Sequence, residues 1–505
     1  MSPQITDETH EAESKRLTID PITRLEGHGK IEIFLNDDGN VENAYWQIPE
    51  LRGFERFCIG RSVEELNKIT SRLCGVCPGA HHICSTKALD KVYNVEPTET
   101  GHKLRELFYQ AHYIHSHIAH FFVLAAPDFV MGPAAPVARR NILGVVDAVG
   151  VDIGGEVIKH RSYAQKVQEM LGGKATHPCG GMPGGVSKGL DEEERKQIEE
   201  WAKSCVDFSK FSLDLLSDVV LKNQDYIDII TDTNIFYNET NYISLVDKDN
   251  KVAFYDGDLR VIDPSGNELY KFHPDNYLDY IAEHVYPWSY EKFPFLKSIG
   301  FKGLVDGPDS GMYRSAPLAR LNASEGFTTP LAQEHYENYF GFFRDAGVKG
   351  PVHFTQAYHW ARLIELLYSS ERMLELAQDP QITNDDIRAP VTETPDEGIG
   401  CIEAPRGVLI HHYKSDPKGI TTDVNLIVGT TNNNGPINMS VRKAASALIK
   451  NWQVSEGLLN TVEMAYRAYD PCNSCATHTL PGELPMKAYI RNPDGSVYKE
   501  LSRNL

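Results

Sequence analysis

The sequence predicts an α+β fold that is predominantly α-helical, with β hairpins at its edges. The chain has 505 residues, of which 41% are hydrophobic and 24% are charged. A chain of this size can bury a large core, in two or three packed subdomains or in one composite domain. An alternating segment near its start meets an Asp38-Gly39 turn, which is typical of a hairpin. Several later segments carry apolar residues at helical spacing.

The first element is the hairpin, which we expect over residues 28–48. Lys30-Ile31-Glu32-Ile33-Phe34 alternates before the turn, and the chain returns through Val41 to Trp46. After Cys84 the pattern becomes helical, and helices are expected over residues 104–124, 191–221, 356–378 and 438–469. The first of these has little charge in its second half, as a core helix does.

Other segments are expected to lie outside these helices. Residues 172–189 and 390–407 are rich in Gly and Pro and should form ordered loops. Residues 238–291 are rich in Tyr, Asp and turn pairs, which indicates a surface β insertion without a chemical role. Residues 1–16 are polar and acidic, so we expect a disordered lead that is neither a signal peptide nor a membrane anchor.

The composition argues against several classes of partner. Asp and Glu outnumber Lys and Arg by 70 to 50, and a net charge of −20 leaves no basic face for nucleic acid. No run approaches the ~20 apolar residues that span a bilayer, so a membrane partner is not expected either. Nine cysteines are too few for a disulfide scaffold. Four of them form Cys-x-x-Cys pairs, which favours metal binding in a reducing compartment, by default the cytoplasm.

These two pairs are the strongest chemical feature. They read Arg72-Leu-Cys74-Gly-Val-Cys77 and Asp470-Pro-Cys472-Asn-Ser-Cys475. A two-residue spacing lets both thiolates of a pair face one metal ion, so four soft ligands from opposite ends of the chain can converge. A four-cysteine zinc site is the alternative that the spacing alone leaves open.

The remaining cysteines and a row of histidines have simpler interpretations. Five cysteines lack metal spacing and are expected to be buried small hydrophobic residues: Cys58, Cys84, Cys179, Cys205 and Cys401. Four histidines face more than one side of a predicted helix, which favours core packing or a partner contact over a separate metal site: His112, His115, His117 and His120.

The residues around the cysteine pairs resemble the large subunit of nickel-iron hydrogenases. Five motifs match in the family's order: Asp20-Pro-Ile-Thr-Arg-Leu-Glu-Gly-His28, Arg52-Gly-Phe-Glu55, Arg72 to His81, Glu403-Ala-Pro-Arg-Gly407 and Asp470 to His478. The resemblance is greatest to the cytoplasmic, multisubunit, bidirectional class. It implies the nickel-iron hydrogenase large-subunit fold over residues 17–478, with a central helical bundle whose loops carry the cysteine pairs.

The resemblance assigns the motif cysteines to a NiFe(CN)2CO centre. Cys74, Cys77, Cys472 and Cys475 would hold nickel, and Cys77 and Cys475 would also bridge to an iron that bears cyanide and carbon monoxide. Glu26 would take a proton from the terminal thiolate of Cys472, the alternative being a surface carboxylate.

Arg406 resembles the family arginine over the open coordination site, with Asp470 as its charge partner; a purely structural arginine is the alternative. The family commonly has Asp-His where this chain has Ser116-His117, so a charged neighbour of Arg406 is absent. This departure affects the surroundings of the arginine rather than the metal site.

The resemblance also implies a second ion, Mg or Fe, near the C-terminus. Its ligands would be Glu55, His478 and the backbone carbonyl of Leu426. His81 resembles the histidine that links the centre to the proximal iron-sulfur cluster of the small subunit, although a satisfied core histidine is the alternative.

The implied function is the reversible heterolytic cleavage of H2 into protons and electrons. Because all four motif cysteines are committed to the centre, the electrons must leave through a small iron-sulfur subunit docked near Cys74, Cys77 and His81. Flavin and iron-sulfur subunits would pass them to NAD(P) or ferredoxin. The alternative from another class is a non-catalytic, hydrogenase-like scaffold subunit of a redox complex, but such subunits generally lack the cysteine pairs.

Residues 479–505 resemble the family's C-terminal maturation extension, which a dedicated protease removes after His478. Pro493-Asp-Gly495 lies between two short alternating runs, so the extension could form a hairpin that holds the C-terminus away from the core. Its removal would then let Cys472, Cys475 and His478 fold inward. A permanent tail paired at a sheet edge is the alternative.

Overall fold

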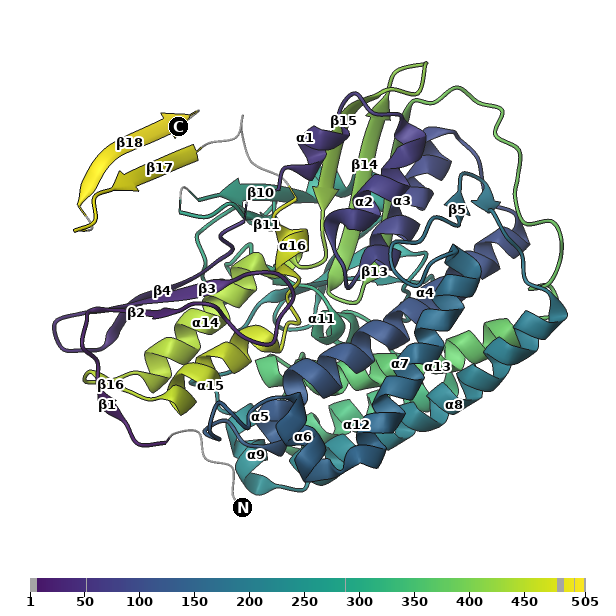
Figure 1. Cartoon of the computed structure of the whole chain (residues 1–505). Helices are drawn as coiled ribbons and strands as arrows, with labels where there is room; N and C mark the ends of the chain where they lie inside the picture. Colours follow the sequence, from purple (N-terminus) through teal and green to yellow (C-terminus); the bar gives the residue numbers. More distant parts are fainter. Residues whose placement is uncertain (1–6, 51, 287, 479–485, 495, 504–505) are drawn as a thin grey trace.

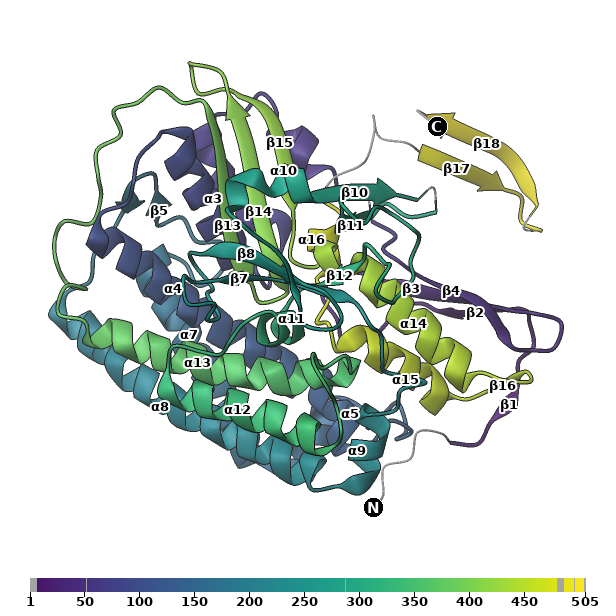
Figure 2. The same cartoon turned by 180° about the vertical axis from the view of Figure 1, so that it is seen from behind.

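A helical bundle forms the largest layer of the molecule and fills the lower half of Figure 1. The computed structural model describes residues 7–50, 52–286, 288–478, 486–494 and 496–503. Four long helices pack side by side in the bundle: α4 (Glu99–Ile118), α7 (Val151–Gly172), α8 (Glu192–Leu216) and α13 (Tyr358–Gln378). α12 (Pro330–Asp345) packs on α13, as Figure 2 shows from behind. The predicted predominance of helix is confirmed.

Local sequence signals explain where the bundle helices begin. Asp191 accepts hydrogen bonds from the backbone N–H groups of Glu193 and Glu194, and its own N–H donates to the Glu194 side chain, which is a capping box. Thr98 caps α4 by accepting from the N–H of Gly101. Such caps satisfy backbone donors that the first turn of a helix leaves free.

Three of the predicted helices are confirmed, with changes of geometry at their ends. The helix predicted over residues 104–124 is α4 followed by a π-helix (Ala119–Ala125). The one over residues 191–221 is α8 followed by a second π-helix (Ser217–Leu221). The one over residues 356–378 is α13, preceded by a 3-10 turn (Thr355–Ala357).

The helix predicted over residues 438–469 is two helices. α14 (Asn434–Leu448) and α15 (Glu456–Arg467) are separated by a turn in which Asn451 and Trp452 adopt positive φ. The turn is followed by β16 (Gln453–Val454), which pairs with β1 (His10–Glu11). The prediction that residues 1–16 form a disordered lead is therefore wrong over its second half. Residues 1–6 lie outside the described part of the chain.

The hairpin predicted over residues 28–48 is confirmed. β3 (Lys30–Leu35) pairs with β4 (Val41–Gln47), and β2 (Arg16–Ile19) pairs with the other edge of β3. The inward side chains of Ile31, Ile33 and Trp46 are fully buried, and α14 packs against β4. The loop of residues 20–29, between β2 and β3, is thereby held beside the C-terminal helices.

A second antiparallel sheet packs on α3 (Pro78–Val92). It consists of β13 (Glu397–Ala404), β14 (Gly407–Ser415) and β15 (Thr421–Ile427). The prediction of a loop over residues 390–407 is thus wrong for its second half. The glycines that indicated a loop permit close packing instead, since a Cβ on Gly400 would lie 2.2 Å from the carbonyl oxygen of Cys84 on α3.

Residues 238–291 contain strands, as predicted, but they are not a purely surface segment. β7 (Asn241–Val246) is buried along its whole length, in a sheet of order β12-β7-β8-β9. The other strands of this sheet are β8 (Asp258–Ile262), β9 (Glu268–Phe272) and β12 (Tyr313–Arg314). β10 (Ile281–Val285) and β11 (Lys292–Leu296) form a separate hairpin.

Short elements connect these layers. They are α1 (Phe54–Cys58), α2 (Leu66–Thr70), α5 (Ala126–Val130), α6 (Ile142–Val149), α9 (Gln224–Ile230), α10 (Tyr277–Tyr280), α11 (Pro317–Asn322), α16 (Asn473–Ala476), β5 (Gly181–Met182) and β6 (Gly185–Val186). β5 and β6 lie in the ordered loop predicted over residues 172–189. Among the described helices, none combines the length and the apolar character needed to cross a membrane.

The C-terminal residues form a hairpin of β17 (Met486–Arg491) and β18 (Val497–Arg503), as the alternating runs predicted. Both views place it apart from the helical and sheet layers (Figures 1 and 2). Residues 479–485, which join it to the rest of the chain, lie outside the described part.

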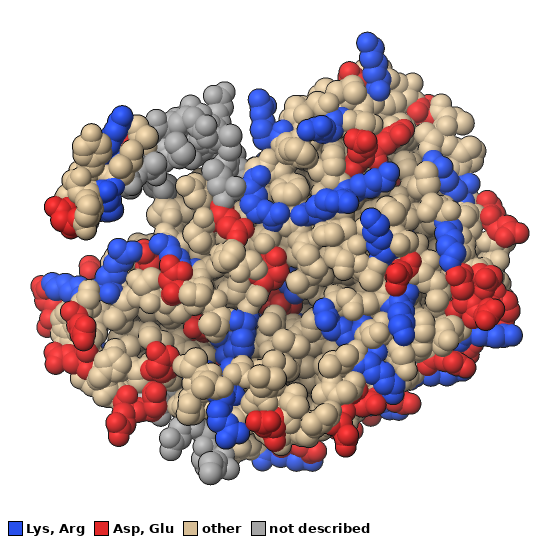
Figure 3. Space-filling view, viewed as in Figure 1, with Lys and Arg blue, Asp and Glu red and all other residues tan. Residues whose placement is uncertain are grey.

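The surface carries charges of both signs. On the face shown in Figure 3, acidic and basic side chains alternate with broad uncharged areas. The prediction that five further cysteines are buried is wrong for one of them, since Cys179 is exposed in the loop after α7. The other four are buried as expected: Cys58, Cys84, Cys205 and Cys401. The four histidines of residues 112–120 are buried in the core.

Candidate metal centre

The two cysteine pairs meet in the interior, although most of the chain separates them. Cys74 and Cys77 lie just before α3, and Cys472 and Cys475 lie at the start of α16 and within it. The Sγ atoms of Cys74 and Cys472 are 3.1 Å apart, and those of Cys77 and Cys475 are 3.2 Å apart. All four sulfurs are buried and lie within 4.8 Å of one another.

Backbone N–H groups and a helix dipole favour negative charge on the first pair. The N–H groups of Val76 and Cys77 donate to Cys74 Sγ at 3.1 and 3.2 Å. Cys77 is also the residue at which α3 begins, so the positive end of that helix lies beside the pair. Both effects stabilise a thiolate over a thiol.

The loops that carry the two pairs are tied together. Arg52 donates to the carbonyl oxygens of Leu73 and Ser474, the second at 3.0 Å, and these residues directly precede Cys74 and Cys475. The N–H of Cys472 donates to Thr430 Oγ1 at 2.9 Å. The relative position of the two loops is therefore fixed by groups other than the sulfurs.

Ionisation of all four sulfurs requires a cation. Burial raises the pKa of Cys472 and of Cys475 well above that of an ordinary thiol, and the sulfurs of Cys74 and Cys77 raise both further. Four thiolates so close together in a low-dielectric interior repel one another strongly. A soft, multivalent metal ion lets all four ionise, so the donor set fits nickel, iron or zinc.

A small cavity lies beside the sulfurs. Cys77, Cys472 and Cys475 border it, together with Arg406 and apolar groups from Ala80, Ala404, Pro405, Leu409 and Val428. A structural zinc ion is enclosed by four protein ligands, whereas a catalytic metal keeps an open position. The cavity leaves space beside the sulfurs for a bound ion or a small ligand, and Arg406 at its edge is a charged group that a structural zinc site does not need.

Glu26 lies against the sulfurs from the loop between β2 and β3. Its Oε2 is 3.0 Å from Cys472 Sγ and accepts the N–H of Ser474 at 3.1 Å. Burial raises the pKa of Glu26, and the charge of Cys74 raises it further. A carboxylate with a raised pKa can exchange protons near neutral pH. The surface carboxylate that we kept as an alternative is not what the structure contains.

Buried ion pairs hold the Glu26 loop in place. The Asp128 carboxylate forms ion pairs with the guanidinium groups of Arg24 and Arg467, with N···O distances of 2.6 and 2.5 Å. Arg24 lies two residues before Glu26. Arg467 lies on α15, which leads directly into the second cysteine pair. One buried carboxylate thus joins the Glu26 loop to the Cys472 loop.

Arg406 lies in the two-residue turn between β13 and β14 and borders the same cavity. Its guanidinium donates to Asp470 Oδ1 at 2.9 Å and to Ser116 Oγ at 3.1 Å. Burial disfavours the charge, but Asp470 and the cysteine sulfurs raise its pKa, so it stays protonated. Ser116 gives the arginine a neutral partner at the position where the family commonly has an aspartate.

The turn that presents Arg406 is held by a second buried arginine. Arg320 donates to the carbonyl oxygen of Ala404 at 2.9 Å and to that of Pro405 at 3.1 Å. It also pairs with Glu365 at 2.5 Å and with Glu403 at 2.7 Å. The loop before Arg406 is therefore fixed by charge-assisted hydrogen bonds.

His81 is fully buried, and both of its ring nitrogens have partners in this chain. Nε2 lies 3.4 Å from Cys475 Sγ, and Nδ1 lies 3.1 Å from Nε2 of His411. Burial lowers the pKa of His81 to about 3, so the ring is neutral. The observed contacts are those of a satisfied core histidine that touches a sulfur.

The residues expected at a second ion also meet. His478 Nε2 lies 2.7 Å from the carbonyl oxygen of Leu426 and 3.6 Å from Glu55 Oε1, which accepts the N–H of Leu426 at 2.8 Å. Burial lowers the pKa of His478 to about 4, which leaves a neutral imidazole. One carboxylate, one imidazole and one carbonyl suit a hard or borderline cation.

Sequence reasoning missed two charged residues at this second group. These are Lys292 and Glu283. Lys292 Nζ lies 3.0 Å from Glu283 Oε2 and 3.7 Å from Glu55 Oε1. Glu283 belongs to residues 238–291, the segment to which we assigned no chemical role, and it lies close to the second group through its ion pair with Lys292. Glu283 and Lys292 lie on the paired strands β10 and β11, whereas Glu55 comes from α1, so no local sequence pattern joins the three residues.

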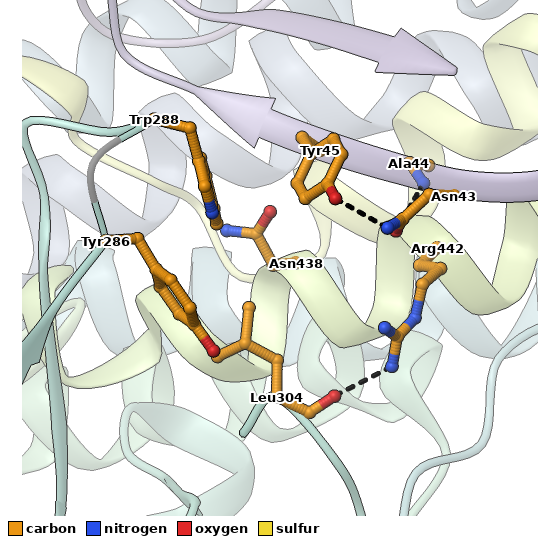
Figure 4. Close-up of a pocket in the computed structure, with 8 residues that line it drawn as sticks. All are labelled: Asn43, Ala44, Tyr45, Tyr286, Trp288, Leu304, Asn438 and Arg442. Carbon is orange, nitrogen blue, oxygen red and sulfur yellow. Dashed lines mark hydrogen bonds between the residues drawn. The ribbon is translucent and has the colours of Figure 1, made fainter. Parts of the chain in front are cut away.

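A separate hollow lies between β4, α14 and the segment before β11 (Figure 4). Tyr45, Tyr286 and Trp288 line it, and Arg442 donates to the carbonyl oxygen of Leu304 at 2.7 Å. None of its lining residues touches the sulfurs or belongs to the second group. It offers no thiol, imidazole or carboxylate and is not the candidate centre.

Two protein-family models match the chain. A nickel-dependent hydrogenase model matches residues 52–139 and 331–478, and a HoxL-like model matches residues 16–51. The chain is 49% identical over 488 residues to an iron-sulfur subunit of the F420-non-reducing hydrogenase of Archaeoglobus profundus, covering 96% of this chain and 99% of that one. It is 36% identical over 505 residues to the beta subunit of the NAD-reducing hydrogenase HoxS of Cupriavidus necator, covering 97% and 100%.

A solved structure matches over most of the fold. The crystal structure of an NAD+-reducing [NiFe]-hydrogenase in the H2-reduced state superposes with a TM-score of 0.86 at 37% sequence identity. The match covers 92% of this chain and 100% of that one.

Proposed function

This chain belongs to the nickel-dependent hydrogenase family as a large subunit, and we propose that it catalyses the reversible heterolytic cleavage of H2 at its four-cysteine centre. The observation that carries the proposal is the cavity bordered by three of the sulfurs and by Arg406, with Glu26 in contact with Cys472. Soft ligands, an open position and a proton acceptor are the elements that heterolysis needs.

The cofactor would be a NiFe(CN)2CO group. Cys74, Cys77, Cys472 and Cys475 would hold nickel, and Cys77 and Cys475 would also hold the iron. When bound, this group would supply a redox-active, thiolate-ligated nickel beside an electron-rich iron. The four converging sulfurs and the membership of the chain in the nickel-dependent hydrogenase family support this assignment.

Glu26 would receive the proton that H2 releases. Its Oε2 is near enough to take a proton from Cys472 Sγ directly. The raised pKa of Glu26 means that it can hold the proton briefly and pass it on. Arg406 would orient the small substrate in the cavity, and Asp470 would keep the charge of the arginine compensated.

A second ion, Mg or Fe, would bind at Glu55, His478 and the Leu426 carbonyl. Leu426 and His478 are already within hydrogen-bonding distance, so an ion would insert where these groups converge. Glu283 and Lys292 would then surround the ion at longer range. Because His478 is three residues beyond Cys475, such an ion would stabilise the C-terminal loop of the main centre.

The partner would be a small iron-sulfur subunit that docks over the edge of the first cysteine loop. Gly75 is exposed and Val76 is half-buried, so this loop brings the surface close to the sulfurs. Arg56, Arg61, Lys68 and Arg72 are exposed nearby, and Figure 3 shows basic side chains over α1 and α2. Electrons would leave by this short route.

Flavin and iron-sulfur subunits would carry the electrons on to NAD(P) or ferredoxin, in a soluble, cytoplasmic complex without membrane or nucleic acid partners. Support comes from the names of two relatives, one from an NAD-reducing hydrogenase and one from an F420-non-reducing hydrogenase, which share nearly the whole length of this chain. Assay of the purified complex with NAD, NADP, ferredoxin and a quinone tests this part. Reaction with the quinone alone would contradict it.

A maturation protease would remove residues 479–505 after His478. The β17–β18 hairpin, apart from the other layers in both views, offers a detachable unit. Cleavage would then let Cys472, Cys475 and His478 take up their buried positions in the centre.

The decisive experiment combines metal analysis with isotope exchange on the purified complex. We expect the large subunit to contain nickel and iron, and the complex to exchange D2 with protons of water. A zinc-only protein would favour the four-cysteine zinc site. A nickel-free protein without exchange, still bound to its redox partners, would favour the non-catalytic scaffold.

A further inference from the structure

The hollow between β4, α14 and the segment before β11 has a volume of about 180 Å³ and lies apart from the metal centre. Figure 4 shows Tyr286 and Trp288 on one side of it and the guanidinium of Arg442 on the other, with Tyr45 between them. All four side chains are half-buried, so they face a space that solvent can enter.

Aromatic rings form one wall of this hollow. The rings of Tyr286 and Trp288 have centroids 5.1 Å apart and planes that differ by only 25°, so their faces continue each other. The ring of Tyr45 lies 4.8 Å from that of Trp288 at an angle of 54° and makes a corner. Phe293, which is fully buried, packs against Tyr286 and Trp288 at 5.3 and 5.7 Å. The protein thus holds the wall in place, and a flat ring can bind to it without first ordering it.

Hydrogen bonds fix the three parts of the lining relative to one another. Asn438 and Arg442 are four positions apart on α14, so they share one face of the helix. Asn438 Oδ1 accepts the N–H of Trp46 at 2.9 Å, which ties α14 to β4. Gln47 Nε2 donates to the carbonyl oxygen of Trp288 at 2.9 Å, which ties β4 to the aromatic segment.

Several acceptors of the lining are already occupied. Asn43 Oδ1 accepts a backbone N–H of β4 at 3.0 Å, and Asn438 Oδ1 accepts the bond just described. The carbonyl oxygen of Leu304 accepts from Arg442 Nη2 at 2.7 Å. The described lining contains no aspartate or glutamate. A cation would therefore find no carboxylate here.

The donors, in contrast, are free. Within the described part of the chain, Arg442 has no ion pair, and its Nε and Nη1 have no acceptor. The indole N–H of Trp288 and the hydroxyl of Tyr286 have no hydrogen-bond partner among the described residues either. Tyr45 accepts from Asn43 Nδ2 at 2.6 Å and keeps its own O–H to donate. A ligand that fits these groups brings acceptors and a negative charge.

The volume of the hollow limits the size of the ligand. A cavity of about 150 Å³ is enough for one benzene ring, and pockets for drug-sized ligands measure roughly 300–1,000 Å³. At about 180 Å³ the hollow suits a single ring with a small substituent. A nicotinamide dinucleotide or a flavin is too large for it.

The surroundings of Arg442 limit the charge of the ligand. Arg442 also borders a second hollow of about 410 Å³, which Glu42 and Asp306 help to line. An anion bound at Arg442 would be repelled by these two carboxylates beyond the guanidinium. A single negative charge is therefore favoured over the two charges of a phosphate ester.

We propose that this hollow is a binding site for a small aromatic monocarboxylate, whose ring lies on the Tyr286–Trp288 wall and whose carboxylate pairs with Arg442. Bidentate pairing of a guanidinium with a carboxylate fixes the orientation of the ligand, and the stacked ring fixes its position. The site is independent of the proposed hydrogenase activity, because none of its lining residues belongs to the metal centre.

The first test compares probes on the unchanged protein. The purified complex is titrated with 4-fluorobenzoate, with the neutral 4-fluorobenzamide and with 4-fluorophenyl phosphate, and binding is followed by 19F NMR. We expect a Kd on the order of 1 mM for the benzoate and binding about tenfold weaker for the amide, with the phosphate also weaker than the benzoate. No binding of the benzoate, or equal or tighter binding of either other probe, would overturn the proposal.

The second test removes the cation. Arg442→Gln keeps an N–H donor for the carbonyl of Leu304 but loses the charge, and it should weaken binding of 4-fluorobenzoate about tenfold. Lys443→Gln is the matched control, since it removes the same charge from the next position of α14, which lines only the second hollow. This control should bind like the wild type. Equal weakening in both variants would show that net charge alone matters and would overturn the site.

The third test separates the aromatic face from the hydroxyl. Tyr286→Phe keeps the ring and should bind 4-fluorobenzoate nearly as well as the wild type, whereas Tyr286→Leu should bind it about twofold to tenfold more weakly. Equal affinities of the two variants would contradict stacking on this wall. Thermal unfolding shows which variants keep the fold, and the comparison of probes decides the proposal even where a variant does not.

The last comparison distinguishes a ligand site from a subunit contact. The isolated full-length chain and the purified complex should bind 4-fluorobenzoate with the same Kd. Binding to the isolated chain alone would overturn the proposal, because it would show that a partner subunit covers the hollow.

Discussion

Glu26 Oε2 lies 3.0 Å from Cys472 Sγ, although 446 positions separate the two residues in the chain. The contact is reinforced by the backbone, because the N–H groups of Asn473 and Ser474 donate to the carbonyl and the carboxylate of Glu26. The acid and the sulfur are therefore held at a fixed distance by three bonds, which suits proton transfer between them.

Glu26→Gln should abolish most hydrogen turnover while leaving the metals in place. Glutamine keeps the shape of the side chain but cannot relay a proton, and general acid–base groups contribute about 10²–10⁴-fold to rates. The measurements are D2/H+ exchange and metal content. Glu42→Gln, at an exposed carboxylate on β4, is the control. Near-normal exchange in Glu26→Gln would remove this residue from the mechanism.

Cys475→Ser should lose nickel and iron together. Serine offers no thiolate, and Cys475 lies within 3.2 Å of the sulfurs of both Cys77 and Cys472. Elemental analysis of the purified variant measures the loss. Cys205→Ala, at a buried cysteine in the helical bundle, should keep both metals. Full activity of Cys475→Ser would contradict the assignment of the centre.

Asp128→Asn should destabilise the fold by about 3 kcal/mol, since it leaves the buried charges of Arg24 and Arg467 without their common partner. Urea unfolding measures the change. Asp256→Asn breaks ion pairs in which the carboxylate side chain is 57% exposed, and it should cost at most ~1 kcal/mol. Equal losses of stability in the two variants would show that the buried ion pairs contribute no more than the exposed ones.

The buried Glu291 side chain should make the free energy of unfolding depend on pH. Burial raises its pKa to about 8, from an ordinary value of 4.5. Between these two values the unfolded chain is ionised while the folded chain still holds the proton, so this residue lowers stability as pH rises. Glu291→Gln should therefore stabilise the protein at pH 7, on the order of 3 kcal/mol, and leave it unchanged near pH 4. Urea unfolding across this pH range tests the slope, and parallel curves would refute it.

The intact mass of active, nickel-loaded large subunit tests removal of the extension. We expect a chain that ends at His478. A fully active chain that still ends at Leu505 would refute cleavage and favour the permanent tail. A variant truncated after His478 should bind both metals as well as the processed protein, since all the proposed ligands lie at or before His478.

The residues proposed for the centre were easier to predict from the sequence than the residues that hold the centre in place. Cys74, Glu26 and Arg406 lie in short motifs, so they could be named without coordinates. Arg320 and Asp128 could not, because a buried ion pair is made by tertiary packing and leaves no local pattern. The same holds for His411, because its contact with His81 on α3 is made by tertiary packing.

Errors in the fold prediction have physical causes as well. Glycines in residues 397–404 indicated a loop, yet they permit a strand to approach the α3 backbone. One continuous helix was predicted over residues 438–469, but positive φ at Asn451 and Trp452 ends α14 and opens a turn that pairs with β1. Asparagine adopts positive φ more readily than most residues, so Asn451 was a local signal for this turn.

Arg52 ties the loop of Cys74 to the loop of Cys475, and this contact has a consequence for biosynthesis. Cys77 and Cys472 are 395 positions apart in the chain, so the four proposed ligands come together only after Cys475 has been synthesised. A nascent fragment that stops before Cys475 lacks part of the ligand set. If these cysteines hold the metals as proposed, delivery of the complete cofactor must follow synthesis of this segment.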